Sequence, residues 1–223
     1  MAYMNYFSKW REVSMDNYTF TKEENELIEK CLVKGHKSWG DACLSKLKTR
    51  LKEYLIKNQD EICCYCYRNI SGEFLMVLDI EHILPKSKYS EFMFNLNNLA
   101  ISCKRCNMEI KRNRIDFIKD INEILSAPFD SNSYLFIHPT IDEYREHIKY
   151  VSAQVNEHKL VFYTIINDSE KGKFSFNFFK LNEFSIDSFN SAQGIEVNNL
   201  IKNELSEIIS DGIKELSKKN DEN

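Results

Sequence analysis

The sequence predicts an α+β fold that is mainly helical and has three parts. Apolar residues recur at helical spacing in residues 1–60, and two Cys-x-x-Cys pairs bracket a short apolar run in residues 61–120. Two apolar runs of strand length and a long amphipathic stripe follow in residues 121–223. We therefore expect an N-terminal helical arm, a core of short strands and one helix around the cysteines, and a C-terminal α/β extension with a β-hairpin and a terminal helix.

The N-terminal arm is predicted to contain two helices. Thr21 followed by Glu24 has the pattern of a capping box, so a helix should start there. A second helix should begin near Asp41 and end near Asn58. Apolar residues recur on one face of each: Leu27, Ile28, Cys31 and Leu32 in the first, and Leu44, Leu47, Leu51, Tyr54 and Leu55 in the second.

In the core, the apolar run 74–80 has the length of a strand. Pro85 should end the element that precedes it. Isoleucines from Ile110 to Ile121, followed by Leu125, indicate a helix that Ala127-Pro128 closes.

In the C-terminal extension, residues 160–166 and 174–179 should be two strands joined by the polar segment 167–172. A final amphipathic helix is expected over about residues 195–216, and the tail 218–223 should be disordered.

Composition narrows the class of protein. A chain of 223 residues with 43% hydrophobic and 29% charged residues can bury a core, and no run of about 18 apolar residues occurs. Residues 1–10 contain no apolar stretch typical of a signal peptide, so we expect a cytoplasmic bacterial protein with no membrane contact. The net charge of −4 argues against coating nucleic acid through bulk charge, but leaves a local basic surface open.

Four of the seven cysteines have the spacing of a metal site. Cys63-x-x-Cys66 and Cys103-x-x-Cys106 are two chelating pairs that together complete a tetrahedral shell for Zn²⁺. Because such a shell leaves no position for water, this zinc should be structural. Cys64 is a weaker alternative ligand, and Cys31 and Cys43 are expected to be small buried hydrophobes on helices.

Chemistry-capable residues lie between and around the two pairs, in a fixed order. They are contained in Asp79-Ile80-Glu81-His82, Pro85-Lys86-Ser87, Asn97-Asn98-Leu99 and Cys103-Lys104-Arg105-Cys106-Asn107. This order resembles the HNH (ββα-metal) endonuclease family, in which an acidic-His pair ends the first strand, a central Asn precedes the second cysteine pair, and an Asn or His opens the following helix. Glu81 stands where Asp is commoner.

The resemblance, which covers about residues 61–118, implies a metal-dependent nuclease. A neutral imidazole is suited to activating water at cellular pH, so His82 should be the general base. Glu81 and Asn107 should hold one catalytic Mg²⁺ or Mn²⁺ through oxygen atoms. Asp79, on the same strand face as Glu81, should be a further ligand or a partner of one, and Asn98 should orient the loop after His82.

A narrower resemblance reaches to about residue 182. The same motifs, with Pro139-Thr140-Ile141-Asp142 and Glu146-His147 further on, are similar to the PtuB-like HNH nuclease subunit of Septu-type anti-phage defence systems, some of them retron-associated. That resemblance implies an ATPase partner of the SMC or ABC kind (Septu PtuA-like), and a retron element is a further candidate partner. The chain itself contains no P-loop motif.

Basic residues gather near the core motifs. Between Lys86 and Lys119 there are eight Lys or Arg residues against three acids. Such a run is often only a solvated helix face, but beside a nuclease core it favours phosphate contacts. The candidates are Lys86, Lys104, Arg105, Lys111 and Arg112. The remaining histidines (His36, His138, His147 and His158) have no partner at ligand spacing, and the C-terminal stripe should cover the protein's own core.

Three functions remain open at this point. The leading hypothesis is an endonuclease with DNA as the favoured substrate; the alternative substrate is RNA, such as tRNA. A non-catalytic zinc module that binds nucleic acid or protein is the second hypothesis. A thiol redox protein is the third, and it is disfavoured because two matched cysteine pairs around a His-containing segment are not a redox arrangement.

Overall fold

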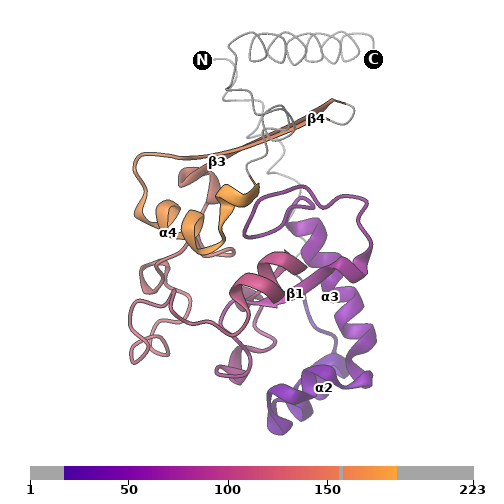
Figure 1. Ribbon diagram of the computed structural model, residues 1–223. Helices are drawn as coiled ribbons and strands as arrows, with labels where there is room; N and C mark the ends of the chain where they lie inside the picture. The colour runs from indigo at the N-terminus through magenta and orange to yellow at the C-terminus, as the bar shows by residue number, and fades with distance from the viewer. Residues whose placement is uncertain (1–17, 156–157, 185–223) are drawn as a thin grey trace, which may run out of the picture. The chain divides into compact units, whose positions relative to one another are not determined.

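The computed structural model describes residues 18–155 and 158–184, which fall into two compact units divided between Tyr144 and Arg145 (Figure 1). Helices and two small antiparallel sheets occur together, so the fold is α+β as predicted. The finer description as mainly helical is not confirmed. The three-part division at residues 60 and 120 stays a prediction. Among the described residues, no helix combines the length and the apolar character that a membrane span requires.

The two helices of the N-terminal arm are α2 (Lys22–Lys34) and α3 (Ser45–Asn58). Thr21 caps α2 in a reciprocal capping box with Glu24, as the sequence predicts. The second helix starts later than expected, because residues 41–44 form a tighter turn first. Its buried stripe is Leu47, Leu51 and Leu55.

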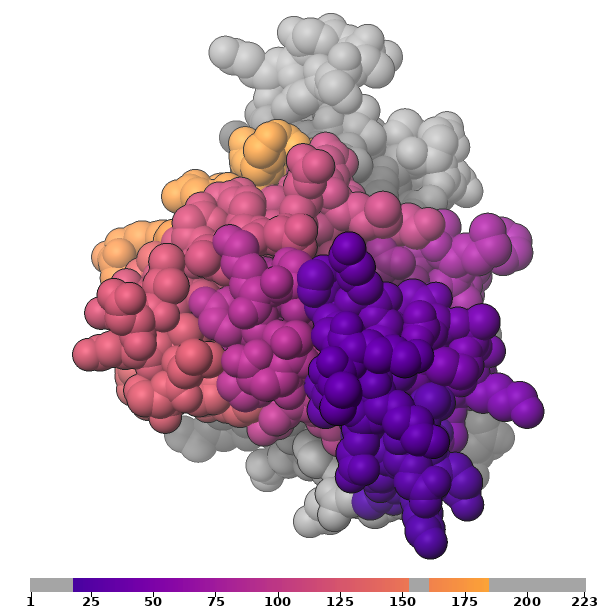
Figure 2. All heavy atoms as spheres, turned by 90° about the horizontal axis from the view of Figure 1, so that it is seen from below, coloured from indigo at the N-terminus to yellow at the C-terminus, as the bar shows by residue number. Residues whose placement is uncertain are grey.

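The arm packs beside the cysteine core. Figure 2 shows the indigo residues of the N-terminal arm lying against the magenta residues of the core. Arg50 of α3 forms an ion pair with Glu24 of α2, which ties the two helices of the arm together. Helix α3 contacts the second strand of the core, so the arm lies next to that strand.

The core consists of two antiparallel strands and one short helix. Strand β1 (Leu78–His82) pairs with β2 (Leu99–Cys103) in the register Leu78↔Cys103 to His82↔Leu99. The helix η6 (Arg105–Lys111) follows β2 directly and has π-helical hydrogen bonding. All five residues of β2 are buried. The sequence predicts a strand, a loop, a strand or turn, and a helix around the cysteines, and the structure contains a strand at the position left open.

The predicted strand over residues 74–80 is wrong at its beginning. Residues 75–77 form a 3-10 turn, closed by the Val77 amide donating to the Phe74 carbonyl at 2.9 Å. Phe74 and Met76 are 85% and 81% exposed. Pairing with β2 starts only at Leu78, because its partner Cys103 is the last residue of β2.

The predicted helix from Ile110 to Leu125 is also wrong beyond Lys111. Arg112 adopts a left-handed φ of 52°, and its amide donates to the Asn107 carbonyl at 2.8 Å, which ends η6. Ile118 instead forms an isolated β-bridge with Tyr134. The pattern of apolar residues does not continue the helix, because Ile121 and Leu125 are exposed and Phe117 packs against Tyr134 and Phe136 instead.

The second unit contains a β-hairpin, but not the predicted one. Strand β4 (His158–Ile165) covers most of the first predicted strand and pairs with β3 (Ile148–Val155). The second predicted strand, residues 174–179, lies largely in helix α4 (Glu170–Phe178). The Ser169 hydroxyl caps α4 by accepting from the Gly172 amide at 3.0 Å, and Phe174 stacks on Phe178 one turn later. The predicted terminal helix and tail lie outside the described residues.

Short 3-10 turns connect the main elements. They are His36–Gly40, Ala42–Leu44, Leu75–Val77, Ser90–Phe92, Leu96–Asn98, Ser131–Ser133, Tyr144–Glu146 and Leu181–Phe184.

Candidate functional site

The four predicted zinc ligands lie together. The Sγ atoms of Cys63, Cys66, Cys103 and Cys106 are all within 4.8 Å of one another, and all four residues are buried. Two come from the turn before β1, one from the end of β2 and one from η6. The Tyr67 amide closes the first turn on the Cys63 carbonyl at 3.0 Å. A sulfur cluster of this size, fully enclosed by protein, fits Zn²⁺.

The other three cysteines stand apart from this cluster. Cys64 is not one of the four ligands; its amide donates to the Ile101 carbonyl at 3.0 Å and attaches the turn to β2. Cys31 is buried in α2, as expected. Cys43 was expected to be buried on a helix and is instead exposed in the turn that precedes α3.

His82 is the last residue of β1, and its ring is held on two sides. Its Nε2 lies 3.1 Å from the Met93 carbonyl, and the ring packs edge-on against Trp39, with centroids 4.5 Å apart. Because a carbonyl can only accept, Nε2 must carry the proton, and Nδ1 keeps its lone pair. Burial, with the positive charge of Lys86, lowers the pKa of His82 to about 3. The imidazole is therefore neutral at physiological pH.

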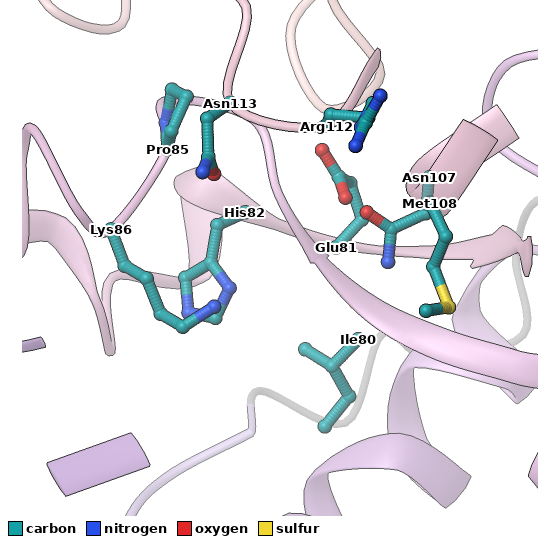
Figure 3. Close-up of a pocket in the computed structure, with 9 residues that line it drawn as sticks. All are labelled: Ile80, Glu81, His82, Pro85, Lys86, Asn107, Met108, Arg112 and Asn113. Carbon is teal, nitrogen blue, oxygen red and sulfur yellow. The ribbon is translucent and has the colours of Figure 1, made fainter. Parts of the chain in front are cut away.

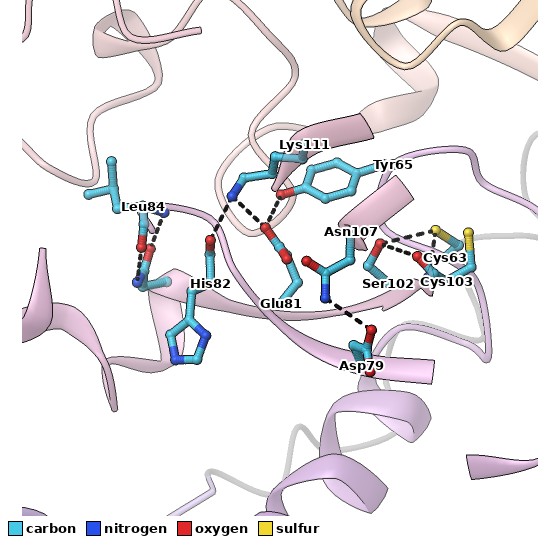
Figure 4. A network of polar contacts seen from close by, with 11 residues as sticks. Cys63, Tyr65, Asp79, Glu81, His82, Leu84, Ser102, Cys103, Asn107 and Lys111 are labelled. Carbon is cyan, nitrogen blue, oxygen red and sulfur yellow. Dashed lines mark hydrogen bonds and ion pairs between the residues drawn. The ribbon is translucent and has the colours of Figure 1, made fainter. Parts of the chain in front are cut away.

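Glu81 is buried and paired. Its Oε1 lies 2.6 Å from the Lys111 ammonium and accepts from the Tyr65 hydroxyl at 3.1 Å. Lys111 also donates to the His82 carbonyl at 2.8 Å. Burial raises the pKa of the Glu81 carboxyl, while Lys111 and Tyr65 oppose that rise. Figure 4 shows how these contacts converge on one carboxylate.

Asn107 and Asp79 form a second hydrogen-bonded pair. The Asn107 amide nitrogen donates to Asp79 Oδ2 at 3.1 Å. That bond fixes the orientation of the amide, so its oxygen points toward the Glu81 carboxylate, as Figures 3 and 4 both show. A carboxylate and an amide oxygen that face each other are ligands that suit a hard divalent cation.

Asn98 is fully buried, and its side chain hydrogen-bonds to backbone groups of residues 84 and 92. Its Oδ1 accepts from the Leu84 amide at 2.7 Å, and its Nδ2 donates to the carbonyls of Leu84 and Phe92 at 3.1 Å each. Its carbonyl also accepts from the Ile83 amide at 3.0 Å. These bonds hold the chain that leaves His82, which is the role expected for Asn98.

Of these residues, Glu81, His82 and Asn107 line one pocket of about 240 Å³ (Figure 3). Of the predicted basic contacts, Lys86 and Arg112 line it, whereas Lys104 and Arg105 do not. Lys111 was expected on an exposed basic face, and this is corrected by its complete burial against Glu81. The pocket is lined by Ile80, Glu81, His82, Pro85, Lys86, Asn107, Met108, Arg112 and Asn113.

Trp39 and Tyr65 were not predicted from the sequence as residues of this site, and Lys111 was predicted to contact phosphate and not Glu81. Trp39 comes from the arm, Tyr65 from the cysteine turn, and Lys111 reaches Glu81 from the end of η6. Only Lys111 carried a signal, since it follows Asn107 by four residues on the same short helix. Nothing in the local sequence connects Trp39 with His82.

Comparisons with known proteins agree with this geometry. The family model described as HNH endonuclease matches residues 63–113. The chain is 30% identical to Septu protein PtuB from Bacillus thuringiensis over 127 residues, which is 57% of this chain and 40% of that protein. It is 30% identical to a histidine–tRNA ligase from Sulfurimonas denitrificans over 95 residues, or 41% of this chain and 24% of the ligase. The chain thus spans less than half of either relative, and no solved structure matches it significantly.

Proposed function

We propose, from the premise that residues 63–113 form an HNH endonuclease domain, that this chain hydrolyses phosphodiester bonds of nucleic acid with a divalent cation, and that DNA is the favoured substrate. One observation carries the proposal. A neutral imidazole with an oriented lone pair and two oxygen acceptors line the same pocket.

His82 would act as the general base. The Met93 carbonyl keeps the proton on Nε2, so Nδ1 is the atom available to take a proton from the attacking water. Trp39 fixes the plane of the ring, and Asn98 fixes the chain that follows it. A base held in one tautomer and one rotamer loses little entropy when substrate binds.

Glu81 and Asn107 would hold the catalytic cation. A carboxylate and an amide oxygen are ligands typical of Mg²⁺ or Mn²⁺, and such an ion, when bound, supplies charge that stabilises the phosphate and the leaving oxygen. Asp79 orients the Asn107 amide through its hydrogen bond, so we assign Asp79 to the surroundings of the ion and not to direct ligation. The cysteine cluster would hold the structural Zn²⁺.

Lys111 would set the charge of Glu81. A buried carboxylate without a partner takes up a proton, whereas the ammonium at 2.6 Å keeps it ionised and ready to ligate. The second contact of Lys111, to the His82 carbonyl, also ties the end of β1 to η6. Lys86 and Arg112, at the wall of the pocket, are the cations best placed for the substrate phosphate.

We further propose that the chain is the nuclease of an anti-phage defence complex. Similarity to Septu protein PtuB over 57% of the chain supports this assignment. An ATPase subunit of the SMC or ABC kind is the partner that the Septu resemblance implies, and it would supply the nucleotide control that this chain has no motif for.

The test is His82→Ala, assayed with DNA and with total cellular RNA in Mn²⁺, with and without the ATPase subunit. We expect cleavage to fall by a factor of about 10² to 10⁴, with zinc content unchanged. His36→Ala, which changes a histidine outside the pocket, is the matched control and should cleave normally. Undiminished cleavage by His82→Ala would refute the proposed mechanism. Binding without cleavage by the wild type, with the partner present, would favour the non-catalytic zinc module.

A further inference from the structure

A second groove, of about 580 Å³, continues from the catalytic pocket onto the N-terminal arm. The two share Ile80, Lys86, Asn107 and Met108 as lining residues, so they form one depression. Figure 1 shows α3 beside β1, and residues of both elements line the groove. The helix lies outside residues 63–113, which the HNH family model covers.

One face of α3 forms a wall of this groove. Ser45, Lys48, Thr49 and Lys52 all line it. Their spacing of i, i+3, i+4 and i+7 places them on one side of the helix over two turns. The adjacent side carries the buried leucines of α3. The polar face is thus fixed in position by the packing of the apolar one.

The groove collects positive charge, since three lysines line it against one acid, Asp79. Within the described part of the chain, no carboxylate forms an ion pair with Lys48, Lys52 or Lys86, in contrast to Lys34 and Lys111. Lys48 donates to the Trp39 carbonyl at 3.0 Å and Lys52 donates to the Leu75 carbonyl. Each ammonium has three donors, so these contacts orient the lysines and leave further donors for a ligand.

The cations also repel one another. Burial lowers the pKa of Lys86, with the charges of Lys111 and Lys48 acting in the same direction against the pull of Glu81 and Asp79. Burial likewise lowers the pKa of Lys52, with Lys104 adding to the effect and Asp79 opposing it. A cluster of this kind costs folding free energy, and an anionic ligand would relieve the repulsion.

We propose that this face of α3 binds the sugar–phosphate backbone of the substrate strand and leads it to His82. The inference rests on the proposed function and adds a binding track outside residues 63–113. Lysines and hydroxyl groups are the side chains that contact phosphates without reading sequence. Two lysines one turn apart, about 6 Å along the helix axis, offer successive contacts along an extended strand. The arm therefore sets the path of the substrate, and the core carries the chemistry.

The test compares two pairs of charge-neutralising variants in the full chain. Lys48→Gln with Lys52→Gln removes two charges from the groove. Lys46→Gln with Lys57→Gln removes two charges from exposed positions of the same helix that do not line it. Binding of duplex DNA, single-stranded DNA and RNA of equal length is measured against salt, in a His82→Ala background that leaves the substrate intact. Glutamine preserves helix propensity, so all variants should fold.

We expect the groove pair to weaken binding about tenfold and to reduce the slope of log affinity against log salt by about 1 to 2, since each lost phosphate contact removes about 0.9 for duplex DNA. The control pair should leave the affinity and its salt dependence unchanged. Lys48→Arg with Lys52→Arg should retain the binding of the wild type. Among duplex DNA, single-stranded DNA and RNA, the one whose binding the groove pair weakens most is identified as the substrate.

Three results overturn the inference in different ways. If the wild type binds nucleic acid but both pairs bind equally, the track is wrong while the proposed function stands. If the groove pair loses only its binding to the ATPase subunit, the surface belongs to that protein. Absence of nucleic-acid binding by every form, the wild type with its partner included, would remove the proposed function together with the track.

Discussion

The two ends of the β1–β2 ladder differ in chemistry. At one end Leu78 pairs with Cys103, one of the four clustered, buried cysteines; at the other, His82 pairs with Leu99, next to side-chain oxygen and nitrogen atoms that line a pocket. The first end is closed and apolar, which suits a permanent ion. The second is polar and accessible, which suits an ion that exchanges and a substrate that leaves.

Asn107 connects these two ends. It follows Cys106, a proposed zinc ligand, directly on η6, and its side chain faces Glu81. We therefore expect a movement of the cysteine cluster to shift a residue of the proposed catalytic pocket. We therefore expect the cysteine end to determine the stability of the protein and, through stability, its activity. The histidine end should determine activity, with smaller effects on stability.

The largest expected effect comes from the cysteine end. Cys106→Ser removes one ligand of a structural ion whose binding contributes on the order of 10 kcal/mol in small zinc domains. We expect loss of zinc, loss of the cooperative melting transition and loss of cleavage. Cys43→Ser, an exposed cysteine outside the cluster, is the control. A variant that loses zinc but melts like the wild type would break the division of roles.

The next effect concerns the buried ion pair at the polar end. Lys111→Met leaves Glu81 buried without its partner, which typically costs about 3 to 5 kcal/mol of unfolding free energy. Adding Glu81→Gln should recover part of that loss, because no charge then remains buried. Chemical denaturation of both single variants and the double variant measures the coupling. Additive effects would show that the pair contributes nothing jointly.

A smaller effect is expected from the pair that orients the amide ligand. Asp79→Asn removes the charge that fixes Asn107, and such outer contacts typically change metal affinity or activity 10- to 100-fold. The concentration of Mn²⁺ needed for half-maximal cleavage should rise accordingly, with little change in melting temperature. Glu109→Gln, an exposed acid on η6, should leave it unchanged. If the required Mn²⁺ concentration rose equally in both variants, the cause would be a general loss of negative charge and not the hydrogen bond to Asn107.

The two ends also differ in how far their structure could be predicted from the sequence. The cysteine cluster is encoded locally, because each Cys-x-x-Cys pair places two ligands on one ion whatever the rest of the chain does. The Thr21 capping box is local in the same sense, and the structure contains it as predicted.

Long-range contacts account for what the sequence did not predict. Lys111 was expected on the surface because basic residues on a short helix usually are; its burial depends on Glu81 and the His82 carbonyl, both on another element. Trp39 meets His82 only because α3 packs beside the core. The helix predicted through Leu125 ended early because η6 closes on Asn107. Periodicity describes one element at a time, and these features arise between elements.

The smallest effect is a pH dependence that should separate the two ends. The pKa of His82 is about 3 in the folded chain and about 6.5 when unfolded. Between those values the unfolded chain binds the proton and the folded chain does not. The free energy of unfolding should therefore fall as pH is lowered through this window, by up to about 1.4 kcal/mol for each pH unit.

His82→Gln isolates this contribution, because glutamine does not titrate and its amide can still donate to the Met93 carbonyl. Denaturation of wild type and variant between about pH 7 and about pH 4.5, with bound zinc measured at each pH, should give a shallower dependence for the variant. The slope that remains in His82→Gln belongs to the other titrating groups, the zinc ligands among them, since acid also protonates thiolates and releases zinc. Equal slopes in the two proteins would mean that the ring is not held neutral by its surroundings. The argument for His82 as a base with a free Nδ1 would then lose its physical support, while the cysteine end would be unaffected.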